Sequence, residues 1–94
     1  MGERTIDDLL NELDISHTRE PPYPEGKFRG DFLVGTTIIE YLGLIGSADY
    51  DAKTRKKKQI CVDHGIPLLL IKPSDIADIP ALTTQLKDLV KLEA

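Results

Sequence analysis

The stretch that decides the fold is DFLVGTTIIEYLG, residues 31–43 of the chain. It belongs to two runs rich in β-branched and aromatic residues, 28–34 and 37–43, which predict two strands. Between the runs lies Gly35-Thr36, and glycine at the first central position suits a two-residue hairpin turn of type II′. A turn this short fixes which residues of the two strands face each other.

The register that follows from this turn places Asp31 directly opposite Glu40 on the neighbouring strand, with Cβ atoms ~5 Å apart. Two acids in that position repel each other, and the aliphatic residues on the same face leave them poorly solvated. Mg²⁺ prefers oxygen ligands and would remove the conflict. The register alone leaves two interpretations open: a metal site, or a solvated pair of acids that binds Arg29 or Lys27.

Patterns on either side of the hairpin predict an α/β fold with the element order α-β-β-β-α-β-α, in which helices flank a four-stranded mixed sheet. Thr5 and Asp8 form a variant capping box before an apolar stripe with helical spacing. Gly65 stands where a later helix needs a left-handed cap, and PLLLIK has the character of a strand covered on both faces. Besides the hairpin strands, the expected elements are a helix from Thr5 to about residue 14, a short strand at 15–20, a loop at 44–49, a helix at 50–64, a strand at 67–72 and a helix at 81–92.

The length of 94 residues predicts a single domain, 1–94, with a thin core that a homodimer would help to stabilise. No apolar run approaches the ~20 residues needed to cross a bilayer, so no membrane partner is expected. The N-terminal segment is acidic, unlike a secretory signal, and the single Cys61 cannot form an internal disulfide. These features predict a cytoplasmic protein.

The net charge of −4 is unevenly distributed along the chain. Residues 1–25 carry a net charge of −5 and residues 73–94 a net charge of −2, whereas residues 26–72 carry +3. The bases of this middle segment crowd into KTRKKK, residues 53–58. Phosphate groups respond to local charge more than to total charge, so a nucleic-acid partner is compatible with the acidic total.

One base of this run, Lys57, has an unusual position on its predicted helix. On a helical wheel at ~100° per residue it falls in the middle of the apolar arc that contains Ile60 and Cys61. A lysine centred on a packing face either extends its stem to reach solvent or points at an anionic group. The first outcome is the commoner one. Asp31 and Glu40 make the second available if this helix packs over their face of the sheet.

An ordered set of short motifs resembles the PD-(D/E)XK nuclease superfamily, in particular its stand-alone and helicase-associated branch. The resemblance spans about residues 15–76 and rests on Asp31-Phe32, Glu40-Tyr41-x-Gly43, Tyr50-Asp51, Lys57 and Gly65-Ile66. It implies a restriction-endonuclease-like core and a magnesium-dependent, endonuclease-like hydrolysis of phosphodiester bonds, in DNA more than in RNA. One departure concerns the superfamily lysine, whose usual position two residues after Glu40 is occupied by Leu42.

The resemblance also implies roles for individual residues. Asp31, Glu40 and the carbonyl of Tyr41 would ligate Mg²⁺ or Mn²⁺, and Glu20 matches an acidic position that some relatives contribute. Lys57 would replace the missing lysine and orient the attacking water or stabilise the developing negative charge. The bases expected to contact phosphates are Lys27, Arg29, Lys53 and Lys58.

Two other functions stay open at this point. Leu42 favours a nucleic-acid-binding module that keeps the fold and has lost catalysis. The acidic first and last segments favour a protein–protein adaptor in which the two acids form a surface pair. A magnesium titration with nucleic acid separates these alternatives, because only a nuclease both binds and cleaves.

Overall fold

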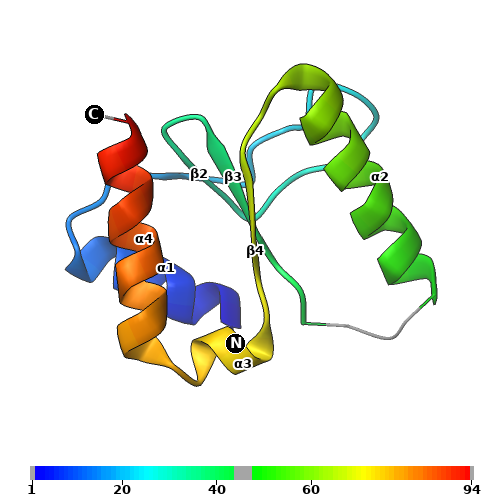
Figure 1. The fold of residues 1–94 in the computed structure, drawn as a ribbon. Coiled ribbons are helices and arrows are strands. Elements are labelled where there is room, and N and C mark those ends of the chain that lie inside the picture. Colours follow the sequence, from blue (N-terminus) through cyan, green and yellow to red (C-terminus); the bar gives the residue numbers. More distant parts are fainter. Residues whose placement is uncertain (1, 44–47, 94) are drawn as a thin grey trace.

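The computed structural model describes residues 2–43 and 48–93, and it contains a four-stranded sheet with helices on both faces (Figure 1). The larger group of helices lies on one face, and a single long helix covers the other. The predicted α/β class and mixed sheet are confirmed. In chain order the elements are α1 (Gly2–Glu12), β1 (Thr18–Arg19), β2 (Phe32–Val34), β3 (Thr37–Tyr41), α2 (Ala48–His64), β4 (Leu68–Ile71), α3 (Pro73–Ile76) and α4 (Ile79–Glu93).

The strands follow the order β1-β2-β3-β4, and β3 and β4 are the parallel pair. Gly35 has a φ of 59°, the left-handed value that the first central residue of the predicted turn requires. The β2–β3 register is confirmed from the turn back to Phe32, which lies opposite Ile39.

The regular pair predicted for Asp31 and Glu40 is not formed, because the β2–β3 ladder ends at Phe32. The N–H of Asp31 donates to the carbonyl of Ile39 over 3.1 Å, so residues 31 and 32 both face Ile39. Two residues of one strand opposite a single residue of its partner form a β-bulge, which bends the strand and changes the direction of its side chains. On the other side of the strand, the carbonyl of Asp31 accepts the N–H of Glu20 over 3.0 Å. The contact with the segment after β1 therefore holds Asp31 out of regular register.

Two apolar clusters cover the two faces of the sheet. The larger one lies between the sheet and helices α1 and α4, and its fully buried members include Ile6, Leu10, Ile39, Ile71 and Leu86. The smaller one lies beneath α2 and consists of Tyr23, Ile38, Ile60 and Cys61. Polar side chains of the candidate site share this second face with the smaller cluster.

The helix boundaries differ from the prediction where tertiary contacts extend a helix. α1 begins at Gly2 and not after Thr5, because residue 2 packs against the ring of Tyr41, where a Cβ would overlap it. α2 and α4 each begin two residues earlier than expected, at Ala48 and Ile79. α3 was not predicted, since four residues are too few to show a helical period. Of the loop expected at 44–49, residues 44–47 lie outside the described part of the chain.

The strands are shorter than predicted: the strand expected at 15–20 is reduced to β1, and β2 lacks the segment 28–31. Gly65 has a φ of 66° and caps α2 as expected. Leu68 packs beneath α2 and Leu69 packs against the larger cluster, so β4 is covered on both faces although it is an edge strand. No helix in the described part of the chain is long and apolar enough to span a membrane.

Candidate functional site

Glu40 is the most deeply buried acid among the described residues, with 5% of its surface exposed. It lies in β3, a central strand with the sequence TIIEY, in which every residue but Tyr41 is buried. Alternation along the strand places it on the face covered by α2, together with Ile38 and Leu42. An ionised carboxylate in such a position is costly unless a cation or hydrogen-bond donors satisfy it.

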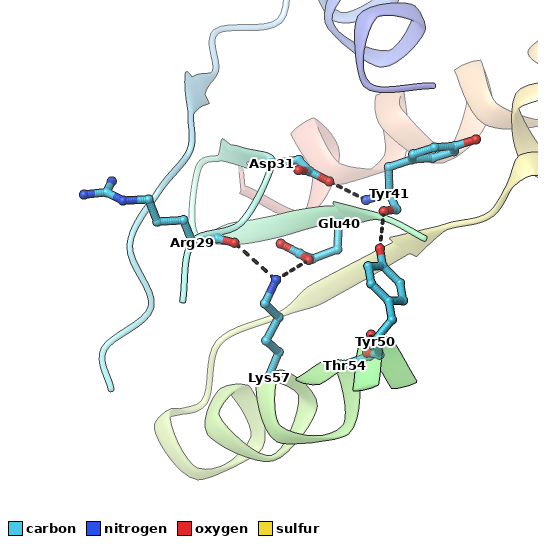
Figure 2. A network of polar contacts seen from close by, with 7 residues as sticks. All are labelled: Arg29, Asp31, Glu40, Tyr41, Tyr50, Thr54 and Lys57. Carbon is cyan, nitrogen blue, oxygen red and sulfur yellow. Dashed lines mark hydrogen bonds and ion pairs between the residues drawn. The ribbon is translucent and has the colours of Figure 1, made fainter. Parts of the chain in front are cut away.

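Lys57 of α2 supplies the cation. Its Nζ lies 2.8 Å from Glu40 Oε2 and donates a second hydrogen bond to the carbonyl of Arg29 over 3.2 Å (Figure 2). The same nitrogen lies 5.5 Å from the centre of the Tyr23 ring, within the range of a cation–π contact. Of the two outcomes open for this lysine, the structure shows the anionic partner and not a side chain extended to solvent.

The Glu40–Lys57 pair leaves the acid only partly satisfied. Burial raises the pKa of the Glu40 carboxyl above its usual range, the hydrogen bond and charge of Lys57 lower it, and the charge of Asp31 raises it again. The resulting pKa is raised. The second oxygen, Oε1, is buried and has no hydrogen-bond partner among the described residues.

Asp31 reaches the same site from the bulge before β2. Its Oδ2 accepts the backbone N–H of Tyr41 over 2.6 Å, as Figure 2 shows. Burial raises the pKa of Asp31, the hydrogen bond from Tyr41 lowers it, and the charge of Glu3 raises it further. The net shift is again upward, so both carboxyls of the site are held in surroundings that disfavour their ionised form.

The backbone N–H and the carbonyl of Tyr41 connect these acids to α2. While its N–H binds Asp31, its carbonyl accepts a hydrogen bond from the hydroxyl of Tyr50 over 2.9 Å. The pKa of the Tyr50 hydroxyl is raised by burial and then by the charges of Glu40 and Asp31, which places this group in the field of both carboxylates. The carbonyl assigned to a metal by resemblance therefore faces into the site.

Glu20, the fourth ligand suggested by resemblance, lies at the exposed rim of the site. Its backbone is in the left-handed region, with a φ of 51°, and its N–H holds the bulge at Asp31. Its charge contributes to the raised pKa of Asp31. Glu3 was not predicted. It lies in the first turn of α1, and its charge also raises the pKa of Asp31.

The basic residues expected to contact phosphates lie outside the acidic pair. The guanidinium of Arg29 donates to the carbonyl of Glu20 over 3.0 Å and binds neither site carboxylate. The other three expected residues, Lys27, Lys53 and Lys58, are exposed. In the described structure the cation that binds Glu40 is Lys57, and neither Arg29 nor Lys27 forms an ion pair with the two acids.

Three observations bear on whether a metal ion fits this site. Among the described residues no group of three or more His, Cys, Asp or Glu side chains is arranged to hold one. The available donors are two carboxylates and a carbonyl, a set that suits a hard cation with water as its remaining ligands. A Cβ on Gly30 would come within 3.2 Å of Glu40 Oε1, so glycine keeps the space beside this unpartnered oxygen free. The donor set fits Mg²⁺ or Mn²⁺.

A second buried oxygen without a hydrogen-bond partner in the described structure is the hydroxyl of Tyr23. Burial and the charge of Glu40 raise its pKa, and Lys57 Nζ contacts both the Tyr23 ring and Glu40. Buried polar groups are nearly always satisfied in folded proteins, and exceptions are expected where a ligand or water completes the set. Tyr23 was missed because nothing in its local sequence marks it.

Comparisons with known proteins support the fold. No family model matches the chain, and no curated protein matches it. Among solved structures, the chain is similar to the catalytic domain of the homing endonuclease I-Bth0305I, with a TM-score of 0.76 and 20% identity. The match covers 99% of this chain and 96% of that chain. At this identity the likeness shows a shared fold, and the assignment to the PD-(D/E)XK superfamily stays a prediction.

Proposed function

We propose that this protein is a metal-dependent nuclease that hydrolyses phosphodiester bonds, with its active site at Asp31, Glu40 and Lys57. The observation that carries the proposal is the contact between Lys57 Nζ and the buried Glu40, 2.8 Å long, at a point where two carboxyls have raised pKa values. Perturbed acids next to a positioned cation are typical of catalytic sites. The similarity to an endonuclease catalytic domain supports the same reading.

In this proposal Asp31, Glu40 and the carbonyl of Tyr41 hold Mg²⁺ or Mn²⁺, and Glu20 contributes from the rim. The cation, when bound, supplies Lewis-acid activation of water and neutralises charge on the phosphate. It also offsets the charge of two poorly solvated carboxylates. In its absence burial raises the pKa of both, and the charge of Asp31 raises the pKa of Glu40 further. Oε1 of Glu40, which has no hydrogen-bond partner among the described residues, is the oxygen available to the cation.

The chain's own contribution is to position charge and exclude water. The carbonyl of Arg29 and the carboxylate of Glu40 hold the Lys57 ammonium from two sides, which limits the directions in which it can move. A cation fixed in this way stabilises negative charge that develops on the phosphate without reorganising during the reaction. The rings of Tyr23 and Tyr50 border the site and reduce its contact with solvent.

Nucleic acid, and DNA more than RNA, is the proposed substrate. The basic residues 53–58 lie on α2, the helix that also carries Lys57, so the acidic ends of the chain do not prevent a phosphate backbone from reaching this side. Lys27, Arg29, Lys53 and Lys58 are the proposed contacts with phosphates. Cytoplasmic location and a homodimer stay predictions from the sequence.

A second candidate is a nucleic-acid-binding module without activity. Leu42 favours it, and so does the Lys57–Glu40 pair, because a lysine satisfied by an acid and a carbonyl can also be a structural ion pair. A protein–protein adaptor is the third alternative. It predicts neither binding nor cleavage of nucleic acid.

The test is a panel of labelled single strands, duplexes, flaps and junctions, in DNA and RNA, titrated with Mg²⁺ and with Mn²⁺. We expect cleavage of at least one substrate that requires the metal, and its loss in Asp31→Asn and in Glu40→Gln. Binding without cleavage across the panel favours the inactive module. Absence of both binding and cleavage favours the adaptor.

A further inference from the structure

A hollow of about 240 Å³ lies next to the proposed active site, beside α2. It lies between α2 and the end of β4, and its residues come from α2 and from the first residues after β3 and β4. Three of its side chains are cationic and one is anionic. The lining residues are Leu42, Tyr50, Asp51, Thr54, Arg55, Lys58 and Lys72.

The three cations of the hollow belong to two separate elements. Arg55 and Lys58 lie three residues apart on α2 and therefore on one side of the helix, whereas Lys72 follows β4. All three are exposed, and none forms an ion pair with another described residue. Asp51 also lines the hollow and forms no ion pair with these cations, so three positive charges face one negative charge there. The cations repel each other, and a bound anion relieves that repulsion.

Tyr50 connects the hollow to the proposed active site. This residue lines the hollow, and its hydroxyl donates to the carbonyl of Tyr41 in the site. Leu42, which also lines the hollow, follows Tyr41 directly. Lys57 and Lys58 are neighbours in sequence, yet Lys57 binds Glu40 and Lys58 lines the hollow, because successive residues of a helix point ~100° apart.

We propose that Arg55, Lys58 and Lys72 bind a phosphodiester group of the nucleic-acid strand, next to the phosphate that is cleaved at Asp31 and Glu40. This inference rests on the proposed function for its substrate. A strand carries phosphates at regular intervals, so a phosphate held in the hollow positions the next one across Tyr50, toward the metal ligands. The fork of the Arg55 guanidinium can bind two phosphate oxygens at once, and the two lysines add point charges.

The decisive variant is Lys72→Ala, because Lys72 lies outside the basic run and no sequence pattern connects it with nucleic acid. Its matched control is Lys91→Ala in α4, an equally exposed lysine whose neighbourhood includes Gly35 at the hairpin turn, at the opposite end of β2 and β3 from the site. Both variants remove the same charge from an exposed position, and thermal melts verify that both fold. The triple variant Arg55→Ala, Lys58→Ala, Lys72→Ala extends the series.

The measurement is the affinity for a labelled DNA duplex in EDTA as a function of salt, combined with single-turnover cleavage in Mg²⁺. Each phosphate contact contributes about 0.9 to the slope of log affinity against log salt. We expect Lys72→Ala to lower the slope by about one contact and the triple variant by about three. We expect KM to rise and the cleavage rate at saturating DNA to stay near that of the unmodified protein. Lys91→Ala should leave all of these values unchanged.

The result that would overturn the inference is a Lys72→Ala variant that matches Lys91→Ala in slope and in KM while the unmodified protein cleaves DNA. In that case the nuclease function stands without this phosphate site. If the unmodified protein binds DNA and cleaves none of the substrates, the proposed activity fails. A reduced slope in Lys72→Ala would then still support the phosphate site. Inorganic phosphate serves as a competitor for a short oligonucleotide. Poor competition supports a polynucleotide as the ligand of the hollow.

Discussion

Lys57 Nζ lies 2.8 Å from Glu40 Oε2 and 3.2 Å from the carbonyl of Arg29, so one ammonium connects α2 to β3 and to the segment before β2. The two side chains are largely buried, with 18% of Lys57 and 7% of Glu40 exposed. Without a metal ion, this lysine is the cation that offsets the charge of the acidic pair.

Replacing Lys57 by methionine should destabilise the protein at neutral pH. The substitution keeps the apolar stem and leaves Glu40 buried without a cation, which we expect to cost about 2 kcal/mol, less than for a fully buried pair because Lys57 is partly exposed. Lys57 lowers the pKa of Glu40, so its removal raises that pKa further. The loss of stability should therefore shrink as the pH falls and Glu40 becomes protonated. Urea unfolding at pH 5 and pH 7 measures it.

The control for this prediction is the double variant Lys57→Met, Glu40→Gln. It removes both charges, and we expect it to be more stable at neutral pH than Lys57→Met alone, since no buried carboxylate is left unpaired. A double-mutant cycle gives the coupling between the two residues. A coupling of zero would mean that the 2.8 Å contact contributes nothing to stability.

Asp31→Asn should stabilise the metal-free protein at neutral pH, since the asparagine oxygen can still accept the N–H of Tyr41. The folded-state pKa of Asp31 is raised, so its contribution to stability is present below the ordinary value of 3.8 and is lost as the pH rises through the folded-state pKa. The advantage of the variant should appear above that range and vanish as the pH falls toward 3.8. An advantage that grows in acid would contradict the direction of the shift. Thermal melts at several pH values follow it.

Mg²⁺ or Mn²⁺ should raise the melting temperature, because a ligand that binds only the folded state stabilises it by mass action. A metal concentration of about 100 times its Kd corresponds to about 2.7 kcal/mol. Asp31→Asn should abolish most of this response, whereas Lys91→Ala should leave it intact. An equal shift in Asp31→Asn and in the unmodified protein would remove Asp31 from the metal ligands.

Tyr50→Phe removes the hydroxyl that donates a hydrogen bond to the carbonyl of Tyr41. We expect a loss of about 1 kcal/mol, because the Tyr41 carbonyl loses a hydrogen-bond donor. The metal-induced rise in melting temperature should persist, since the carbonyl then has a free lone pair for the cation. If the response disappears, the hydroxyl of Tyr50 and not the carbonyl of Tyr41 belongs to the metal site.

The parts of this structure that follow from short-range patterns could be predicted from the sequence. Gly35 determines the hairpin, and the hairpin determines the register as far as Phe32. The position of Lys57 on the sheet-facing side of α2 follows from the period of the helix alone. These local rules place Lys57 on the packing face of its helix, whereas its contact with Glu40 depends on α2 covering that face of the sheet.

The parts that depend on distant segments could not be predicted in the same way. The bulge at Asp31 depends on the N–H of Glu20, which a hairpin register does not include. Glu3 approaches Asp31 because α1 continues to Gly2 against the ring of Tyr41. Lys72 meets Arg55 and Lys58 only once β4 has paired with β3. Each of these contacts joins residues far apart in the chain, so the hydrophobic periodicity of the sequence does not indicate them.

The most direct test of the central claim is a comparison of Lys57→Ala with Lys56→Ala in single-turnover cleavage with Mg²⁺. Lys56 precedes Lys57, is exposed, and lies 6.0 Å from the centre of the Phe28 ring, away from the acids. We expect Lys57→Ala to lower the cleavage rate at saturating nucleic acid by about 100-fold or more, with little change in binding. Lys56→Ala should instead weaken binding by about one phosphate contact and leave that rate nearly unchanged. A Lys57→Ala variant that cleaves as fast as Lys56→Ala would contradict the account.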